Sequence, residues 1–317
     1  MSAKALKTLV VGGAGFIGTH LVRLLCAEGR REVIVAGRRV HAPADFPSTA
    51  RYVSLDVADE NALLPLLSGV DEIIDLAYAT VPKTSFDDPV HDVLANLPAT
   101  VNLLKKASGL PLRRFLLVSS GGTVYGNARN LPIEEDHPTN PVSPYGITKV
   151  AAEKYALMFM QLHDLPAVIV RPGNPYGPNQ FGRLTQGFIG AAMFAAVNRQ
   201  PVTVFGERGT VRDYIYIDDL CRGLMAALEY GEPGDIFNIG TGIGRDNLSI
   251  LELLSDIVSR DGYTLDIEFK PARPFDVAAN VLNSSRLSSA SGWHPQVSLE
   301  SGLQATWDFV KNNLIKQ

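Results

Sequence analysis

Short apolar runs alternate with longer segments of helical spacing through the first half of the chain. Runs rich in valine, isoleucine and leucine predict strands at 7–11, 32–36, 72–76, 114–119 and 167–171. Between them, apolar residues recur three and four positions apart, which predicts helices at 18–28, 61–67, 90–107 and 145–163. Because strands that are buried on both faces read as continuous apolar runs, this alternation predicts an α/β fold with a doubly wound parallel sheet of the Rossmann type.

The pattern changes after residue 171. Prolines and glycines crowd residues 172–178, which marks a loop or a junction between domains. Shorter elements follow, with helices predicted at 187–198, 218–230, 249–260 and from 299 onward, and a strand at 202–205. We therefore expect a dinucleotide-binding domain over 1–173, to which 214–242 return, and a second, smaller α/β substrate lobe over 174–317.

Composition narrows the class of protein. The 317 residues carry a net charge of −4, which argues against a general nucleic-acid-binding surface. The only two cysteines, Cys26 and Cys221, lie in helix-like runs and make neither a disulfide framework nor a metal-ligand cluster. We see no secretory signal pattern and no apolar run of the ~20 residues that a membrane helix needs. We therefore expect a cytoplasmic protein with no bound metal and no membrane partner.

A glycine-rich segment follows the first predicted strand. Gly12, Gly15 and Gly18 are spaced three apart between that strand and a predicted helix. Glycine lets the backbone turn sharply and approach a pyrophosphate, and the amino end of a helix attracts phosphate. A tight turn without a ligand would explain the glycines alone, but the strand before and the helix after favour a nicotinamide dinucleotide.

The end of the second strand bears on the form of the cofactor. An acidic residue at this point typically binds the ribose 2′-hydroxyl of NAD, whereas this chain has Gly37 followed by Arg38 and Arg39. A guanidinium can pair with the 2′-phosphate of NADP, but it can also stack on adenine or face solvent. Asp56 and Val57, after a third strand, are expected beside the adenine, although Asp56 could equally be a surface aspartate.

Tyr145 and Lys149 are the candidate catalytic pair. They lie four residues apart in a predicted helix and so share one face. A nearby ammonium group would lower the pKa of the tyrosine phenol, which is ordinarily near ~10, and let it act as a base. Such a spacing also occurs on ordinary helix surfaces. The glycine loop and the Ser119-Ser120 pair that ends a strand between the two motifs make catalysis the better interpretation.

Seven segments together resemble the extended short-chain dehydrogenase/reductase family, and most closely its UDP-glucose 4-epimerase-like nucleotide-sugar epimerases and dehydratases. The resemblance spans nearly the whole chain and is carried by GGAGFIG at 12–18, SSGGTVYG at 119–126, SPYGITK at 143–149, RPGNPYGP at 171–178, RDYIYIDD at 212–219, FNIG at 237–240 and RPFD at 273–276.

The resemblance implies roles for individual residues. Tyr145 would be the general acid and base at a sugar hydroxyl, and Lys149 would hold the nicotinamide ribose. Asn96 would brace the backbone of the active site within the cofactor region. The implied cofactor, usually NAD, would also contact Phe16, Ile17, Ala77 and Pro172. The implied substrate, a nucleotide-diphosphate sugar, would contact Ser120, Asn174, Arg212, Arg273 and Asp276. From the residues alone, Arg212 could instead pair with Asp213 or Asp218, and Arg273 could be a loop charge.

One position departs from the family pattern. Relatives usually carry serine or threonine four residues before the tyrosine of the VYG segment, and here that residue is Gly121. Thr123 or Ser120 could supply the missing hydroxyl, although Thr123 could also be a plain turn residue. We take Thr123 as the third candidate catalytic residue.

These features predict a nucleotide-sugar 4-epimerase that acts on a UDP- or dTDP-hexose. An NADPH-dependent 4-ketosugar reductase is the alternative, because it suits Arg38 and Arg39. A dehydratase fits less well, since its acid/base carboxylates are absent after Ser120, and a scaffold or sensor without catalysis is a further possibility. The family often dimerises through two long helices, here 90–107 and 145–163. Apolar Met158, Phe159 and Leu162 could serve that interface or the internal core.

Overall fold

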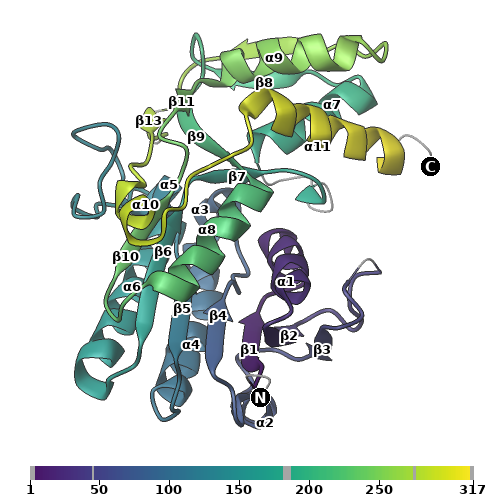
Figure 1. Ribbon diagram of the computed structural model, residues 1–317. Coiled ribbons are helices and arrows are strands. Elements are labelled where there is room, and N and C mark those ends of the chain that lie inside the picture. The colour runs from purple at the N-terminus through teal and green to yellow at the C-terminus, as the bar shows by residue number, and fades with distance from the viewer. Residues whose placement is uncertain (1–3, 45, 181–186, 274–275, 315–317) are drawn as a thin grey trace.

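A parallel sheet of seven strands forms the centre of the molecule. The computed structural model describes residues 4–44, 46–180, 187–273 and 276–314 (Figure 1). The strand order is β10-β6-β5-β4-β1-β2-β3, and every neighbouring pair is parallel. The strands are β1 (Leu6–Val11), β2 (Arg31–Gly37), β3 (Arg51–Ser54), β4 (Glu72–Asp75), β5 (Arg114–Val118), β6 (Ala167–Pro172) and β10 (Ile236–Ile239). The predicted doubly wound sheet is confirmed.

Helices cover both faces of this sheet because alternate side chains of each strand point to opposite faces. Leu9 and Val11 pack into the core beneath α2 (Glu60–Leu67), α4 (Pro89–Ala107) and α6 (Pro144–His163). Val10 packs into the opposite core beneath α1 (Phe16–Glu28), α8 (Ile217–Tyr230) and α10 (Ser285–Ser291). Since both faces of β1 are buried, its sequence is apolar at consecutive positions.

A smaller lobe lies beyond the carboxyl ends of the central strands, at the top of Figure 1. Its strands are β7 (Asn174–Tyr176), β8 (Val202–Phe205), β9 (Val211–Tyr216), β11 (Gly244–Arg245), β12 (Ile267–Lys270) and β13 (Ala279–Asn280). A third hydrophobic core, which includes Trp307, joins β7, β8 and β9 to α7 (Phe188–Asn198), α9 (Asn247–Ser259) and α11 (Leu299–Leu314). The short helices α3 (Pro82–Asp87) and α5 (Gly121–Val124) follow β4 and β5.

The chain returns to the central sheet after β9. Helix α8 packs on α1, and β10 pairs with β6, whereas 214–216 belong to β9 and pair with β7 in the smaller lobe. We keep the division at residue 173, with 214–242 joining the first domain, as a proposal. The short strands β7, β11 and β13 escape prediction because each has only two or three residues and takes its register from β9.

This topology determines where a ligand can sit. From β1 the chain runs outward through β2 and β3, and then crosses back to β4, so the strand order reverses between β1 and β4. In open parallel sheets the crevice at such a reversal, outside the carboxyl ends of the strands, is the usual binding site. The loops after β1 and β4 meet there.

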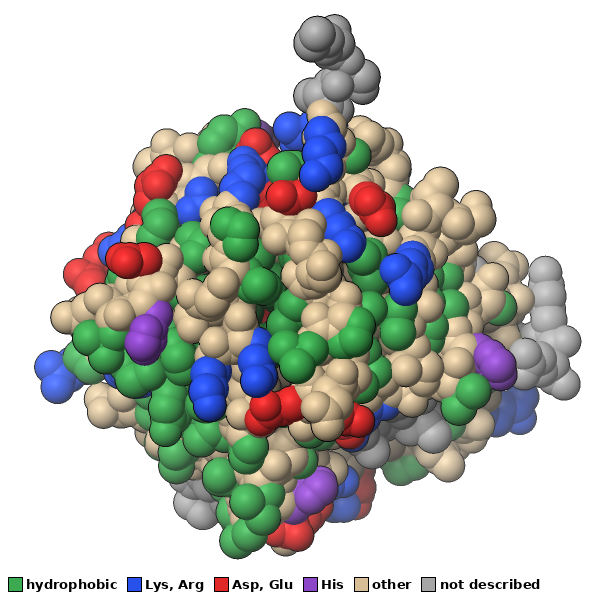
Figure 2. Space-filling view, turned by 90° about the horizontal axis from the view of Figure 1, so that it is seen from below, with side chains coloured by type: hydrophobic (Ala, Val, Ile, Leu, Met, Phe, Trp, Pro, Cys, Tyr) green, Lys and Arg blue, Asp and Glu red, His purple; other side chains and the backbone are tan. Residues whose placement is uncertain are grey.

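On the face seen from below, acidic and basic side chains are interspersed (Figure 2). None of the helices in the described ranges combines the length and the apolar character that crossing a membrane requires.

Candidate active site

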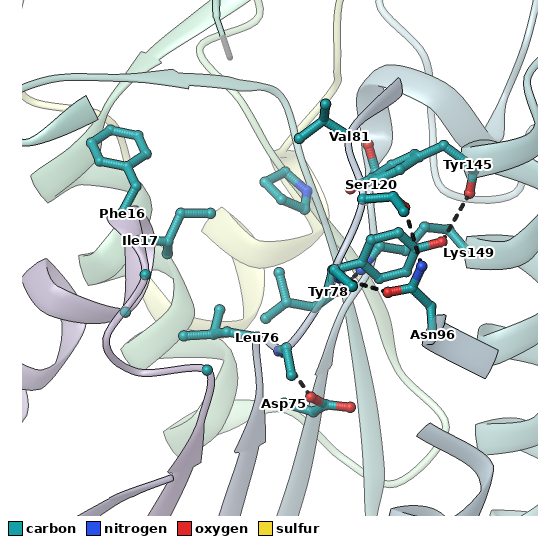
Figure 3. A pocket seen from close by; sticks show the side chains of 18 of the residues that line it. Phe16, Ile17, Asp75, Leu76, Tyr78, Val81, Asn96, Ser120, Tyr145 and Lys149 are labelled. Atoms are coloured by element: carbon teal, nitrogen blue, oxygen red, sulfur yellow. Dashed lines mark hydrogen bonds between the residues drawn. The ribbon is translucent and has the colours of Figure 1, made fainter. Parts of the chain in front are cut away.

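A cavity of about 710 Å³ opens at the strand-order reversal and extends toward the smaller lobe. Figure 3 shows Phe16 and Ile17 on one side of it, facing Ser120, Tyr145 and Lys149 on the other. Most of the predicted site residues line this cavity: Gly12, Gly15, Phe16, Ile17, Gly18, Arg38, Asp56, Val57, Ala77, Asn96, Ser120, Thr123, Tyr145, Lys149, Pro172, Asn174 and Arg212. Arg273 and Asp276 do not.

The glycine-rich loop is a cradle that side chains would fill. Gly12 has φ +78°, and a Cβ there would lie 2.8 Å from the backbone nitrogen of Ala77. A Cβ on Gly18 would lie 2.5 Å from the Cα of Gly13. The N-cap of α1 is Gly15, which offers no side chain to the first amides of the helix. These amides lack intrahelical partners, so the loop and helix end fit a pyrophosphate.

Tyr145 and Lys149 project from the first turns of α6 into the cavity. The chain enters this helix through Ser143, whose hydroxyl accepts from the amide of Gly146, and Pro144 occupies the first helical position. Lys149 is buried and its Nζ donates to the carbonyl of Val118 at 2.9 Å. Burial lowers the pKa of Lys149 to about 8, against the opposing attraction of Asp75.

The ring of Tyr78, which the sequence analysis did not single out, packs against both Tyr145 and Lys149. Tyr78 lies in the loop after β4, with its ring centroid 4.7 Å from that of Tyr145 and 4.0 Å from the Nζ of Lys149. The Lys149 Nζ lies 5.8 Å from the Tyr145 ring. Burial raises the pKa of both phenols, and Asp92 raises that of Tyr145 further. A cation held this close is the group that can lower the pKa of Tyr145.

Besides Asp92, the carboxyl of Asp75 is buried near Lys149. Asp75 ends β4, where its carboxylate accepts from the amide of Ala77 at 3.0 Å. Burial raises its pKa to about 6, while the amide and the Lys149 charge act in the opposite direction. Asp75 thus holds the turn at Ala77 by a hydrogen bond and attracts the charge of Lys149.

A hydrogen-bonded network braces the loop that carries Tyr78. The Asn96 side chain accepts from the amide of Ala79 at 2.6 Å and donates to the hydroxyl of Thr80 at 3.1 Å. Asp92, which is fully buried one turn earlier on α4, accepts from the hydroxyls of Thr80 and Thr148. Asn96 therefore holds the backbone of the loop after β4, and its role in an active site stays a prediction. Asp92 was missed, because an acidic residue at the start of a helix reads as ordinary surface charge.

Gly121 occupies a closed position. A Cβ there would lie 2.6 Å from the Leu282 side chain and 2.8 Å from the carbonyl oxygen of Arg171. The neighbouring hydroxyl residues face the cavity instead. The buried Thr123 Oγ1 and the buried Asn174 Oδ1 have no hydrogen-bond partner among the described residues. Two unpartnered polar atoms on one cavity wall are what a bound hydroxylated ligand would satisfy.

The predicted phosphate-binding arginines are not equivalent. Arg212 lines the cavity, and its Nη1 donates to the carbonyls of Val211 and Val277 at 2.8 Å each. The alternative ion pair of Arg212 is wrong, because Asp213 accepts from the amide of Leu282 and Asp218 pairs with His20.

Arg273 is exposed and pairs with Asp276 through bonds of 2.8 and 3.0 Å. Its guanidinium also lies 4.1 Å from the Phe205 ring centroid. Their predicted contact with substrate stays a prediction, and residues 274–275 of the RPFD segment lie outside the described residues.

The smaller lobe closes the far end of the cavity. We expected substrate-selecting residues within 80–85, 176–184 and 204–207. Thr80, Tyr176 and Gln180 do line the cavity, residues 181–184 lie outside the described residues, and none of 204–207 lines it. Strand β8 carries residues 202–205 and pairs with β12, away from the cavity wall. Phe188 and Tyr214 also line the cavity, although no motif in the sequence pointed to them.

Comparisons with known proteins agree with this geometry. Residues 8–240 match the model of the NAD dependent epimerase/dehydratase family. The chain is 34% identical over 314 residues to a UDP-glucose 4-epimerase of Mycolicibacterium smegmatis, covering 97% of this chain and 99% of the relative.

Two solved structures are similar along the whole chain. A Thermotoga maritima UDP-glucose 4-epimerase with UDP-glucose has a TM-score of 0.90 at 31% identity, covering 98% of this chain and 100% of that one. A Thermus thermophilus UDP-glucose 4-epimerase in complex with NAD has a TM-score of 0.89 at 30% identity, again covering 98% and 100%.

Proposed function

Because the chain belongs to the NAD dependent epimerase/dehydratase family, we propose that it is a nucleotide-sugar 4-epimerase acting on a UDP- or dTDP-hexose. One observation carries the proposal. Tyr145 and Lys149 lie in a single cavity that the glycine-rich loop borders on one side and the smaller lobe on the other. A redox cofactor and a sugar substrate could both reach the same phenol from these two sides.

The cavity fits a nicotinamide adenine dinucleotide, and NAD is the cofactor named for a solved relative. Gly12, Gly15 and Gly18 would hold the pyrophosphate, and Lys149 would hold the nicotinamide ribose. Arg38, Asp56 and Val57 would surround the adenosine, and Phe16, Ile17, Ala77 and Pro172 would complete the walls. When bound, the cofactor supplies a hydride acceptor and donor that is regenerated in each cycle.

The phenol oxygen of Tyr145 would accept the proton from the sugar O4 and would later donate it back to O4. Lys149 would stabilise the phenolate by its charge, and Tyr78, packed on both, would exclude water from the pair. Thr123 would hydrogen-bond the reacting sugar oxygen, with Ser120 beside it, and Asn174 would contact the sugar or diphosphate. Arg212 and Arg273 would bind the diphosphate, and Asp276 would bind a ribose hydroxyl of the nucleotide.

A one-way 4-ketosugar reductase is the second candidate, and Arg38 with Arg39 at the cavity end is the observation that favours it. The two reactions differ in their cofactor balance. An epimerase returns each hydride to its substrate, whereas a reductase consumes one NADPH per turnover.

The test is to incubate the purified protein with UDP-glucose, UDP-galactose, their N-acetylated forms and dTDP-hexoses, and to separate the 4-epimers by chromatography. We expect interconversion of one pair without net change in cofactor absorbance. Tyr145→Phe should lower the rate by about 10²–10⁴-fold, the usual contribution of a general acid–base group. Tyr155→Phe, an exposed phenol on the same helix, is the matched control. No conversion of any pair would refute the epimerase, and NADPH loss with a 4-ketosugar would establish the reductase.

We further propose a homodimer in the cytoplasm. Helices α4 and α6 pack together, and exposed apolar side chains remain on both, at Val90 and Val93 and at Ile147 and Leu162. Phe159 instead lies in the internal core, with 8% of its surface exposed, against 65% for Leu162. The face of α6 that carries Leu162 is therefore available to a second copy. Free Cys26 and Cys221 suit a reducing compartment.

A further inference from the structure

Two arginines border the end of the cavity beside β2. Gly37 ends this strand, and Gly37, Arg38 and Arg39 all line the cavity. Both arginine side chains are exposed, and within the described ranges neither guanidinium makes a salt bridge or a hydrogen bond. Among the described residues, therefore, no acidic group pairs with the two positive charges at this end of the cavity.

The described part of β2 ends without a carboxylate that could bind a ribose diol. A dinucleotide site that selects NAD typically places an acidic side chain at the end of the second strand, where it accepts from the ribose 2′-hydroxyl. Among the described lining residues, the acids are Asp56 and Asp75. Asp56 follows β3 and accepts from the amide of Ala58 at 3.0 Å, and Asp75 is buried at the end of β4. Neither belongs to β2.

Tyr52 packs closely against the end of β2. The hydroxyl of this β3 residue lies 3.1 Å from the carbonyl oxygen of Gly37 and 2.8 Å from that of Arg39. A Cβ on Gly37 would lie 3.1 Å from the same hydroxyl, which is closer than ordinary contact. Tyr52 is itself held edge-on against Phe46, with ring centroids 6.1 Å apart. The Tyr52 hydroxyl thus anchors the backbone of 37–39 and crowds any side chain at position 37.

We propose that Arg38 and Arg39 form a subsite for the 2′-phosphate of the adenosine ribose, so that this chain binds NADP as well as NAD, and binds NADP more tightly. The inference rests on the proposed function only in that the cavity holds a nicotinamide dinucleotide. A phosphate brings about two negative charges and three acceptor oxygens, which guanidinium groups complement well. The diol of NAD brings no charge, so the arginines gain little from it.

Calorimetric titration of the purified protein with NAD, NADP, ADP and 2′,5′-ADP tests the subsite without turnover. Any dinucleotide that co-purifies is first released, identified by mass and removed. We expect NADP to bind at least about tenfold more tightly than NAD, and 2′,5′-ADP more tightly than ADP, from one or two charge-assisted hydrogen bonds. The advantage should shrink at high salt, because the subsite is exposed.

Variants assign the effect to residues. Arg38→Ala and Arg39→Ala should each weaken NADP binding about five- to tenfold and leave NAD within about twofold. Tyr52→Phe should weaken NADP binding less, since it removes only the anchor of the backbone. Arg51→Ala is the matched control, because this exposed β3 residue has the same charge but does not line the cavity.

Two results would overturn the proposal: equal or weaker binding of NADP than of NAD, or an Arg38→Ala variant that loses NAD and NADP alike, as adenine stacking requires. The outcome is separable from that for the epimerase. Selective NADP binding without conversion of any nucleotide sugar supports the subsite and refutes the proposed function. Conversion by a protein that prefers NAD does the reverse.

Discussion

Serine at position 121 would restore the hydroxyl that related sequences carry, and we expect it to harm this protein. The Cβ of the new residue would lie 2.6 Å from a methyl group of Leu282 and 2.8 Å from the carbonyl oxygen of Arg171. Leu282 is fully buried, so its side chain has little room to move, and the Arg171 oxygen belongs to the backbone at the end of β6. The space beside Gly121 is therefore core and not cavity.

The size of the effect follows from two opposing contributions. Overpacking a well-filled site costs about 1–3 kcal/mol. Replacing glycine restricts the unfolded chain, which returns about 0.4–1 kcal/mol. The free energy of unfolding should thus fall by about 1–2 kcal/mol. For 317 residues the entropy of unfolding is about 0.7 kcal/mol/K, so the melting temperature should fall by about 2–3 °C.

Scanning calorimetry and the epimerase assay together test this reasoning on Gly121→Ser. The matched control is Gly122→Ser, whose Cβ would meet only side-chain tips, at 3.3 Å from Asn174 Oδ1 and 4.0 Å from Ser120 Oγ. The control should keep the melting temperature of the parent within about 1 °C. A Gly121→Ser protein that melts at or above the parent temperature, or that turns over faster, would refute the packing argument.

Three further predictions concern buried polar groups and assembly. Asp92→Asn should lower the free energy of unfolding, measured in urea, by about 1–3 kcal/mol and should also lower kcat. The reason is that the single oxygen of the new amide cannot accept hydrogen bonds from both Thr80 and Thr148. Unchanged stability would contradict the bracing role of Asp92. Burial raises the pKa of Asp75 from 3.8 to about 6, so the folded state holds the extra proton in that window and stability falls as pH rises through it. Asp75→Asn should therefore gain about 1–2 kcal/mol relative to the parent between pH 5 and pH 8, and a constant difference would exclude the shift. Leu162→Glu on the exposed face of α6 should convert the proposed dimer to a monomer in sedimentation, whereas an unchanged mass would place the interface elsewhere.

The sheet and the candidate catalytic pair could be predicted from the sequence because each depends on a local pattern. Strands β1, β2, β4, β5 and β6 are apolar at consecutive positions, and only a doubly covered parallel sheet buries such strands on both faces. The glycine spacing at 12–18 and the four-residue spacing of Tyr145 and Lys149 are likewise local. The structure places both motifs on one cavity.

Other parts of the site could not be read from the chain. Tyr78 and Asp92 have no motif of their own and matter through residues that fold against them, Lys149 and Thr148. The two phosphate-binding candidates looked alike as arginines before aspartates or prolines, yet Arg212 lines the cavity and Arg273 does not. Which side chain reaches a cavity depends on the strand pairing of β9 and β13, and that pairing is not local.

The sequence by itself determined the class of fold, the glycine-rich loop and the candidate phenol and ammonium of Tyr145 and Lys149, because periodicity and spacing act over one or two turns of chain. Only the tertiary structure decided the meaning of Gly121 and Gly37. Both are merely glycines in the sequence. In the structure, the side chain of Leu282 occupies the space beside Gly121, and the hydroxyl of Tyr52 crowds the space beside Gly37. Contacts between distant segments depend on packing. Packing therefore decides whether a glycine reflects the loss of a functional side chain or a position where the neighbours leave no room for one.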